Sequence, residues 1–238
     1  MLRIGTSGWS YNHWKGLFYP EELPKEEWLE HYCQHFDTVE LNSSFYHLPK
    51  LMTFENWYKR TPNGFLFSVK GSRFISHILK LNRAREPLQR LLDIASGLKE
   101  KLGPILFQLP PNFTIDLERL EKFAKVLPTD RRFTFEFRHE SWFGDETYNL
   151  LKKNNLALTI SDTPKYPLVF EVTADFVYVR LHGHEVLYAS KYSQTELKEW
   201  AERIKGWLEQ NLDVHIYFDN DAHAHAIQNA QELREFFM

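Results

Sequence analysis

Short apolar runs alternate with helix-like segments along the whole chain, and this alternation limits the fold more than any other feature. Eight runs have the character of strands: 2–7, 38–42, 65–70, 104–109, 133–138, 156–161, 176–182 and 213–219. Amphipathic segments lie between most of them, at 24–36, 53–61, 85–102, 117–127 and 193–211. Such alternation is typical of parallel strands joined by crossover helices. Eight units in 238 residues predict a TIM-like (β/α)8 barrel, whose usual size is about 250 residues.

The segment after the sixth predicted strand, 162–175, has the pattern of a loop, so we expect the barrel to lack a regular helix there. No low-complexity segment, charge block or Gly/Ser linker marks a domain boundary. We therefore predict a single TIM-like barrel domain of the α/β class over residues 1–238. A doubly wound open sheet is the alternative, but "GTSGWS" after the first strand matches a glycine-rich phosphate loop poorly.

Polar side chains keep to one parity of several predicted strands. In "RFTFEFRHESW", residues 132–142, Glu136 and Arg138 alternate with phenylalanines. An open sheet that is covered on both faces would not segregate polar residues in this way, whereas a closed barrel does so near the mouth of its active site. We therefore expect the phenylalanines to meet helices, and Glu136 and Arg138 to point inward, where charge must be paired or used.

The overall charge and the cysteine content exclude several classes of protein. A net charge of −3 provides no global basic field for nucleic acid or an anionic membrane. A single cysteine excludes an intramolecular disulfide. No apolar run is long enough for a signal peptide or a membrane-spanning helix. We expect a cytoplasmic protein without a membrane partner.

Six stretches resemble, in order, the domain of unknown function 72 family: "IGTSGWSYNHWKGLFYP", "FDTVELNSSFYHLP", "LFQLPPNF", "FEFRHESWF", "YVRLHG" and "NAQEL". The resemblance covers nearly the whole chain and implies a TIM-like barrel. It implies no reaction, because the family's name records that none is established. His77 matches a histidine that the family usually has after the third strand. Asn220 matches one of the paired asparagines that usually follow the last strand.

Charged and polar side chains follow the carboxyl ends of the predicted strands, which meet at one face of a TIM barrel where enzymes of this fold work. Lys70, Arg138 and Arg180 suit a phosphate or carboxylate, because guanidinium groups match the geometry of such anions. Aromatic rings just beyond the strands are candidates to stack on a substrate. The predicted substrate-binding set is Lys70, Arg138, Arg180, Gln108, Asn42, Asp162, Asn220, Trp9, Tyr46 and Trp142, with Asp219 as a further charged neighbour.

Three residues of this face suit proton transfer. Glu136 and Glu40 are candidates for a general acid and a general base, and His182 has an ordinary pKa near neutrality. We favour an enzyme that acts on an anionic, phosphate-bearing organic substrate and requires no cofactor.

Three alternatives stay open. The first is a divalent-metal-dependent phosphodiesterase or endonuclease on nucleic acid, with His77, Asp162 and His182 as ligands, similar to apurinic-site endonucleases of the TIM fold. It ranks second, because cations facing the same cavity repel a metal. A non-catalytic ligand-binding protein is the next alternative. In the last, the charges only neutralise one another inside the barrel. The histidines of "AHAHA", His223 and His225, are interpreted as solvated loop residues.

Overall fold

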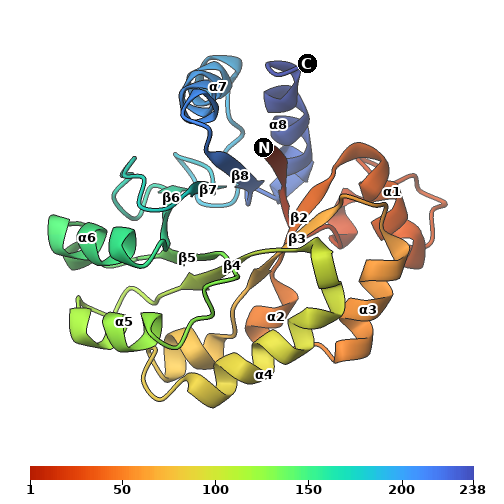
Figure 1. Cartoon of the computed structure of the whole chain (residues 1–238). Helices are drawn as coiled ribbons and strands as arrows, with labels where there is room; N and C mark the ends of the chain where they lie inside the picture. The colour runs from red at the N-terminus through yellow and green to blue at the C-terminus, as the bar shows by residue number, and fades with distance from the viewer. The chain divides into compact units, whose positions relative to one another are not determined.

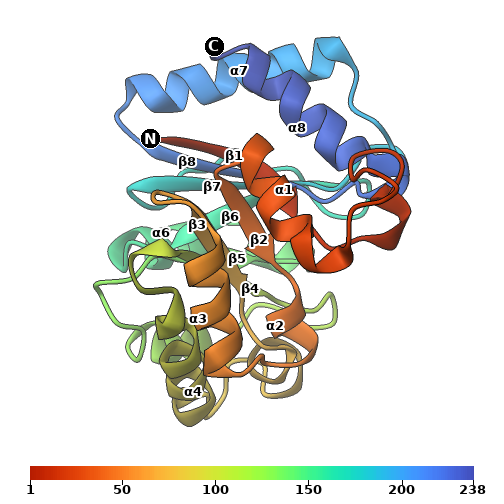
Figure 2. The same ribbon diagram turned by 90° about the vertical axis from the view of Figure 1, so that its right-hand side faces the viewer.

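The computed structural model describes residues 1–238 and contains eight parallel strands, which close into a barrel in the order β1 to β8. The strands, of which β2 to β8 are labelled in Figure 1 and β1 in Figure 2, are β1 Leu2–Ser7, β2 Thr38–Leu41, β3 Leu66–Lys70, β4 Leu102–Gln108, β5 Phe133–Glu136, β6 Ala157–Asp162, β7 Phe176–Leu181 and β8 Asp213–Phe218. Each lies within or overlaps one of the runs that the alternation indicated. The predicted TIM-like fold of the α/β class is confirmed.

Helices occupy most of the connections, and β6 is joined to β7 without one, as predicted. The α-helices are α1 Trp28–His35, α2 Ser43–Tyr46, α3 Leu51–Arg60, α4 Arg85–Ala95, α5 Leu117–Ala124, α6 Asp145–Lys153, α7 Gln194–Glu209 and α8 His225–Glu235. The short helices are η1 Asn12–Trp14, η2 Lys25–Glu27, η4 Ser96–Lys101, η5 Glu140–Trp142, η6 Ala222–Ala224 and the π-helix η3 Phe74–Ile78. No helix combines the length and the apolar character that a membrane crossing needs.

The chain forms two compact units. The first consists of Met1–Glu40, Ile160–Leu168 and Asp175–Met238, and the second of Leu41–Thr159 and Val169–Ala174. In the first unit β7, β8 and β1 pair in parallel register, and α7 and α8 lie side by side near β8 (Figures 1 and 2). In the second unit β3, β4 and β5 pair in the same way. Its helices α3 and α4 lie close together (Figure 2).

Helix α7 begins as the sequence predicts. The Ser193 side chain accepts a hydrogen bond from the backbone N–H of Glu196, and the Glu196 carboxylate accepts one from the backbone N–H of Ser193, at 2.8 Å. This capping box satisfies donors that have no partner within the helix. The apolar residues Leu197, Trp200 and Ile204 are buried, which fixes α7 against its unit.

The phenylalanines and Glu136 of β5 lie on opposite faces of the strand, as their alternation predicts. Phe135 lies against Phe123 of α5, with ring centroids 6.2 Å apart. Phe107 of the neighbouring strand β4 contacts the same ring at 5.1 Å. Because successive side chains of a strand point to opposite faces, Glu136 lies on the face of β5 that is turned away from α5. The phenylalanines thus meet a helix, and the carboxylate is left to find polar partners on the other face.

Candidate functional site

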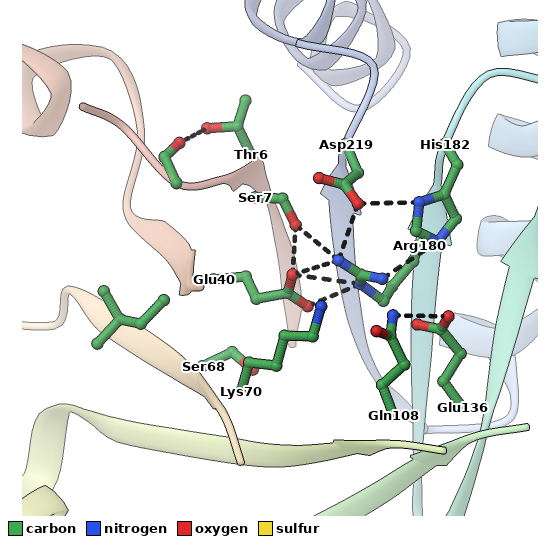
Figure 3. Close-up of polar contacts among 12 residues, drawn as sticks. Thr6, Ser7, Glu40, Ser68, Lys70, Gln108, Glu136, Arg180, His182 and Asp219 are labelled. Atoms are coloured by element: carbon green, nitrogen blue, oxygen red, sulfur yellow. Dashed lines mark hydrogen bonds and ion pairs between the residues drawn. The ribbon is translucent and has the colours of Figure 1, made fainter. Parts of the chain in front are cut away.

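The first unit contains a buried polar network around Arg180, near the end of β7 (Figure 3). Arg180 is 0% exposed. Its Nη2 lies 2.8 Å from Glu40 Oε1 and its Nε 3.0 Å from Glu40 Oε2, which makes a bidentate ion pair. Nη2 also lies 3.0 Å from Asp219 Oδ2 and 3.1 Å from Ser7 Oγ. One guanidinium is therefore held by two carboxylates and a hydroxyl.

Glu40, in β2, is held from several sides. Its Oε2 accepts a hydrogen bond from the Tyr178 hydroxyl at 2.7 Å, and its Oε1 accepts one from Ser7 Oγ. Tyr178 and Arg180 share a face of β7 because they are two residues apart. The Glu40 side chain is itself 0% exposed. Its oxygens thus accept hydrogen bonds from groups inside the first unit and do not face solvent.

The geometry around His182 defines its tautomer. Arg180 Nη1 lies 3.1 Å from His182 Nε2. A guanidinium can only donate, so Nε2 accepts and the ring proton resides on Nδ1. Nδ1 lies 2.9 Å from Asp219 Oδ2, within ion-pair distance. His182 is 1% exposed and lies between Arg180 and Asp219.

Arg180, Glu40 and His182 are arranged as in the last alternative from the sequence, in which buried charges neutralise one another. Arg180 was expected to bind substrate and Glu40 and His182 to transfer protons, but all three are engaged with one another, Ser7, Tyr178 and Asp219. Burial of charges that are paired with one another is typical of a structural network. Their predicted catalytic and binding roles remain predictions, and we do not base a function on them.

The second unit contains a cluster at the ends of β4 and β5. Gln108 and Glu136 are directly paired in the register of the two strands. Gln108 Nε2 donates to Glu136 Oε1 at 2.9 Å (Figure 3), and Arg138 Nε donates to the same oxygen at 2.7 Å. Glu136 is 1% exposed, whereas the Arg138 side chain is 16% exposed. The structure thus brings together three predicted site residues, with the arginine nearest to solvent.

Lys70, at the end of β3, and His77, in the π-helix η3, meet at one aromatic ring. Lys70 Nζ lies 4.6 Å from the centroid of the Phe45 ring, a cation–π contact. The His77 ring centroid lies 5.0 Å from the same centroid. Ser76 Oγ is 2.9 Å from His77 Nδ1 and helps to orient the imidazole. A π-helix is rare and frequently marks a functional position.

The charges around His77 are mainly positive. Burial, followed by the positive charges of Arg138, Arg73 and Lys70, lowers the pKa of His77 to about 4, while Glu136 opposes them. At neutral pH the imidazole is therefore neutral and lies among three cations and one carboxylate. Such a surrounding disfavours a bound cation and favours an anion.

Several other predicted residues have structural partners. Trp142 is 0% exposed, donates from Nε1 to Phe113 O at 2.6 Å and stacks on Phe137, so it packs in the core rather than facing a ligand. Asn220 is also buried and donates to Ser190 O and Asn229 Oδ1, which joins the loop after β7 to α8.

Asp162 belongs to this structural group as well. Its carboxylate accepts hydrogen bonds from the side chains of Tyr192 and Trp200, and burial raises its pKa. The structure holds no group of three or more His, Cys, Asp or Glu side chains that could bind one metal ion. The metal alternative with His77, Asp162 and His182 therefore has no preformed ligand group to support it.

The remaining predicted residues differ in exposure. Asn42 is half-buried, and its Oδ1 is buried without a hydrogen-bond partner. Trp9 is half-buried, and the Tyr46 side chain is 73% exposed. Buried acceptors without a donor are unusual in folded proteins.

Sequence reasoning missed Phe45 and Arg73. Phe45 lies outside the strands, in α2, and no pattern distinguishes it from a core phenylalanine. Arg73 precedes a π-helix that has no sequence signature of its own. The family histidine in that helix was the one signal that could have directed attention to this segment.

A family model and curated proteins resemble this chain over all or part of its length. The family model described as "Protein of unknown function DUF72" matches residues 3–238. The UPF0759 protein YunF of Bacillus subtilis (strain 168) is 27% identical over 271 residues, which covers 99% of this chain and 94% of that protein. The UPF0759 protein YecE of Escherichia coli (strain K12) is 31% identical over 153 residues, which covers 63% of this chain and 54% of that protein.

Solved structures with the same fold are also found. A DUF72 family protein of Thermotoga maritima MSB8 has a TM-score of 0.90 and 30% identity, covering 100% of this chain and 99% of that one. A DUF72 family protein of Enterococcus faecalis V583 has a TM-score of 0.85 and 22% identity, covering 99% of this chain and 95% of that one. The second likeness concerns the fold alone.

Proposed function

The chain belongs to the DUF72 family of proteins of unknown function, and we propose that it is an enzyme whose second unit binds the anionic group of an organic substrate through Lys70 and Arg138. The proposal rests on one observation. His77 is surrounded by the positive charges of Lys70, Arg73 and Arg138, with Glu136 as the opposing charge. Three positive charges and one carboxylate act on this one half-buried histidine, and this arrangement favours an anion over a cation as a ligand.

A phosphate group suits these cations best. Arg138 has the planar guanidinium that matches phosphate or carboxylate oxygens, and Lys70 adds a compact charge whose position is fixed by the Phe45 ring. Lys70 is 9% exposed, so its charge acts where water screens it weakly.

Glu136 is the candidate for proton transfer. Two donors on its Oε1 favour the ionised carboxylate, the form that a general base requires. The neutral imidazole of His77 adds no positive charge and serves as a hydrogen-bonding group. The reaction class is acid–base chemistry on a phosphate-bearing organic molecule, such as hydrolysis or elimination.

A panel of phosphoesters and sugar phosphates tests the proposal. We expect turnover of at least one member, inhibition by inorganic sulfate, and loss of turnover in Glu136→Gln with an unchanged circular dichroism spectrum. Glutamine is the matched replacement, because its carbonyl can still accept from Gln108 and Arg138. Binding of phosphate without turnover of any panel member would instead support a non-catalytic binding protein. Absence of phosphate and sulfate binding would overturn the anion site itself.

A further inference from the structure

A cavity lies in the first unit, outside the network around Arg180. Three segments that follow adjacent strands form it: η1 after β1, the loop after β7 and η6 after β8. Its volume is about 440 Å³, within the range of about 300–1,000 Å³ that is usual for small-molecule sites. Leu17, Leu187 and Tyr188 supply apolar walls, and His13, Asp221 and His223 supply polar groups.

The backbone around this cavity is held in unusual conformations. Tyr188 has φ 66°, His223 has φ 53° and Ala224 has φ 59°, all in the left-handed region that disfavours side chains. Tyr188 N–H donates to His182 O at 2.6 Å, and Tyr188 O accepts from Ala222 N–H at 3.3 Å. Non-glycine residues persist in this region where surrounding contacts hold them, and they concentrate at functional sites.

The electrostatics of the cavity are dominated by Asp221. Its carboxyl is half-buried, and burial together with the negative charge of Asp219 raises its pKa. The Asp221 backbone carbonyl accepts from His13 Nε2 at 2.8 Å and from Trp14 Nε1 at 3.0 Å. The Asp221 carboxylate has a weaker contact, because its Oδ2 lies 3.6 Å from His13 Nε2, which is too long for a hydrogen bond.

We propose that this cavity binds an organic amine, with its ammonium group on the Asp221 carboxylate and its apolar body against Leu17, Leu187 and Tyr188. An ammonium group would relieve both the burial of the Asp221 charge and its repulsion from Asp219. An anion would be repelled by the Asp221 carboxylate, the one carboxylate among the residues that line the cavity. A bare inorganic cation would make no apolar contact with the walls of the cavity.

The exposure of the walls fits an apolar ligand body. Leu17 is 62% exposed and Tyr188 38% exposed, and both line the cavity. Covering them with a hydrocarbon or an aromatic ring removes apolar surface from water. The Tyr188 ring can also stack on an aromatic ligand or attract its cation. The proposal concerns the first unit and does not depend on the anion site of the second.

Three probes of one shape separate the charge from the apolar body: phenethylamine, 2-phenylethanol and 3-phenylpropionate. They are titrated into the full-length protein at pH 8, above the ordinary pKa of imidazole, and followed by calorimetry and by NMR. We expect the amine to bind at least ten-fold more tightly than the alcohol, and the acid to bind least. Asp221→Asn should remove the preference for the amine and leave the affinity for the alcohol unchanged.

Two further variants complete the test. Leu17→Ser should weaken both the amine and the alcohol, and because Leu17 is largely exposed this variant should fold even if Asp221→Asn does not. Asp130→Asn, at a side chain 75% exposed in the second unit, is the matched control and should change nothing. The proposal is wrong if amine and alcohol bind equally, if no probe binds, or if Asp221→Asn and Leu17→Ser both leave amine binding intact.

Discussion

Arg180 and Glu40 form a bidentate ion pair in which both side chains are 0% exposed. Removing one partner of such a pair leaves an uncompensated buried charge, which destabilises a protein by about 3–5 kcal/mol. We therefore expect Arg180→Met to lower the free energy of unfolding by about that amount, as measured by urea unfolding followed by circular dichroism. Arg131→Met, at a half-exposed arginine, is the control and should have little effect.

The same pair can be tested as a unit. Replacing Glu40 by Gln in the Arg180→Met background removes the orphaned charge, so the double variant should be more stable than the sum of the two single effects predicts. Strict additivity would mean that the two side chains do not interact energetically. In that case the buried network would not be the structural element that its geometry indicates.

The second prediction concerns Arg138. Arg138→Ala should weaken the binding of inorganic phosphate by about 1.5–3 kcal/mol, the scale of a hydrogen bond to a charged group. Binding is measured by ³¹P NMR titration or calorimetry. Lys122→Ala, at an exposed lysine of α5 in the same unit, changes the net charge equally and is the matched control. Equal losses in both variants would indicate a general charge effect and contradict the proposed site.

The strands of this fold could be predicted from the sequence because both of their signals are local. Apolar runs and period-two alternation identified all eight strands, and the amphipathic pattern at 193–211 located α7. Helix α6 was missed because its buried side chains are only Thr147 and Leu151, too few for a periodic apolar stripe. Helix α2 was missed because it is a single turn of four residues.

For the site residues, the sequence could predict only the face of the strand on which each side chain lies. Parity correctly put Gln108 and Glu136 together, because adjacent strands in register align their faces. It could not distinguish Arg138, which retains some exposure, from Arg180, which is enclosed by partners from three other strands and their ends. That difference depends on distant segments and on side-chain rotamers. Trp142 illustrates the same limit, because a ring beyond a strand end can fold back into the core.

The third prediction concerns Lys101, a buried lysine outside the site. Its Nζ donates to Tyr58 O and Thr61 O, both at 2.7 Å, and to Thr61 Oγ1 at 3.1 Å. These bonds satisfy carbonyls near the end of α3, which lack partners within the helix. Lys101→Met should lower the free energy of unfolding by about 1.5–3 kcal/mol. Lys99→Met, an exposed neighbour, should have little effect, and equal stability of both variants would show that the carbonyls find other donors.

The last prediction follows from the pKa of His77, which burial and then Arg138, Arg73 and Lys70 lower from 6.5 to about 4, against the opposing charge of Glu136. Between about pH 4 and pH 6.5 the unfolded chain binds a proton at His77 that the folded protein does not bind. The contribution of His77 to stability is therefore fully present above pH 6.5 and is lost as the pH falls towards 4. Because other carboxylates titrate in the same window, the wild type must be compared with His77→Gln, which should show a flatter decline. In NMR titrations the imidazole of His77 should have its midpoint near pH 4, and Arg138→Ala should raise that midpoint. A midpoint at the ordinary value in the wild type would mean that the cations do not act on His77, and would remove the main support for an anion site.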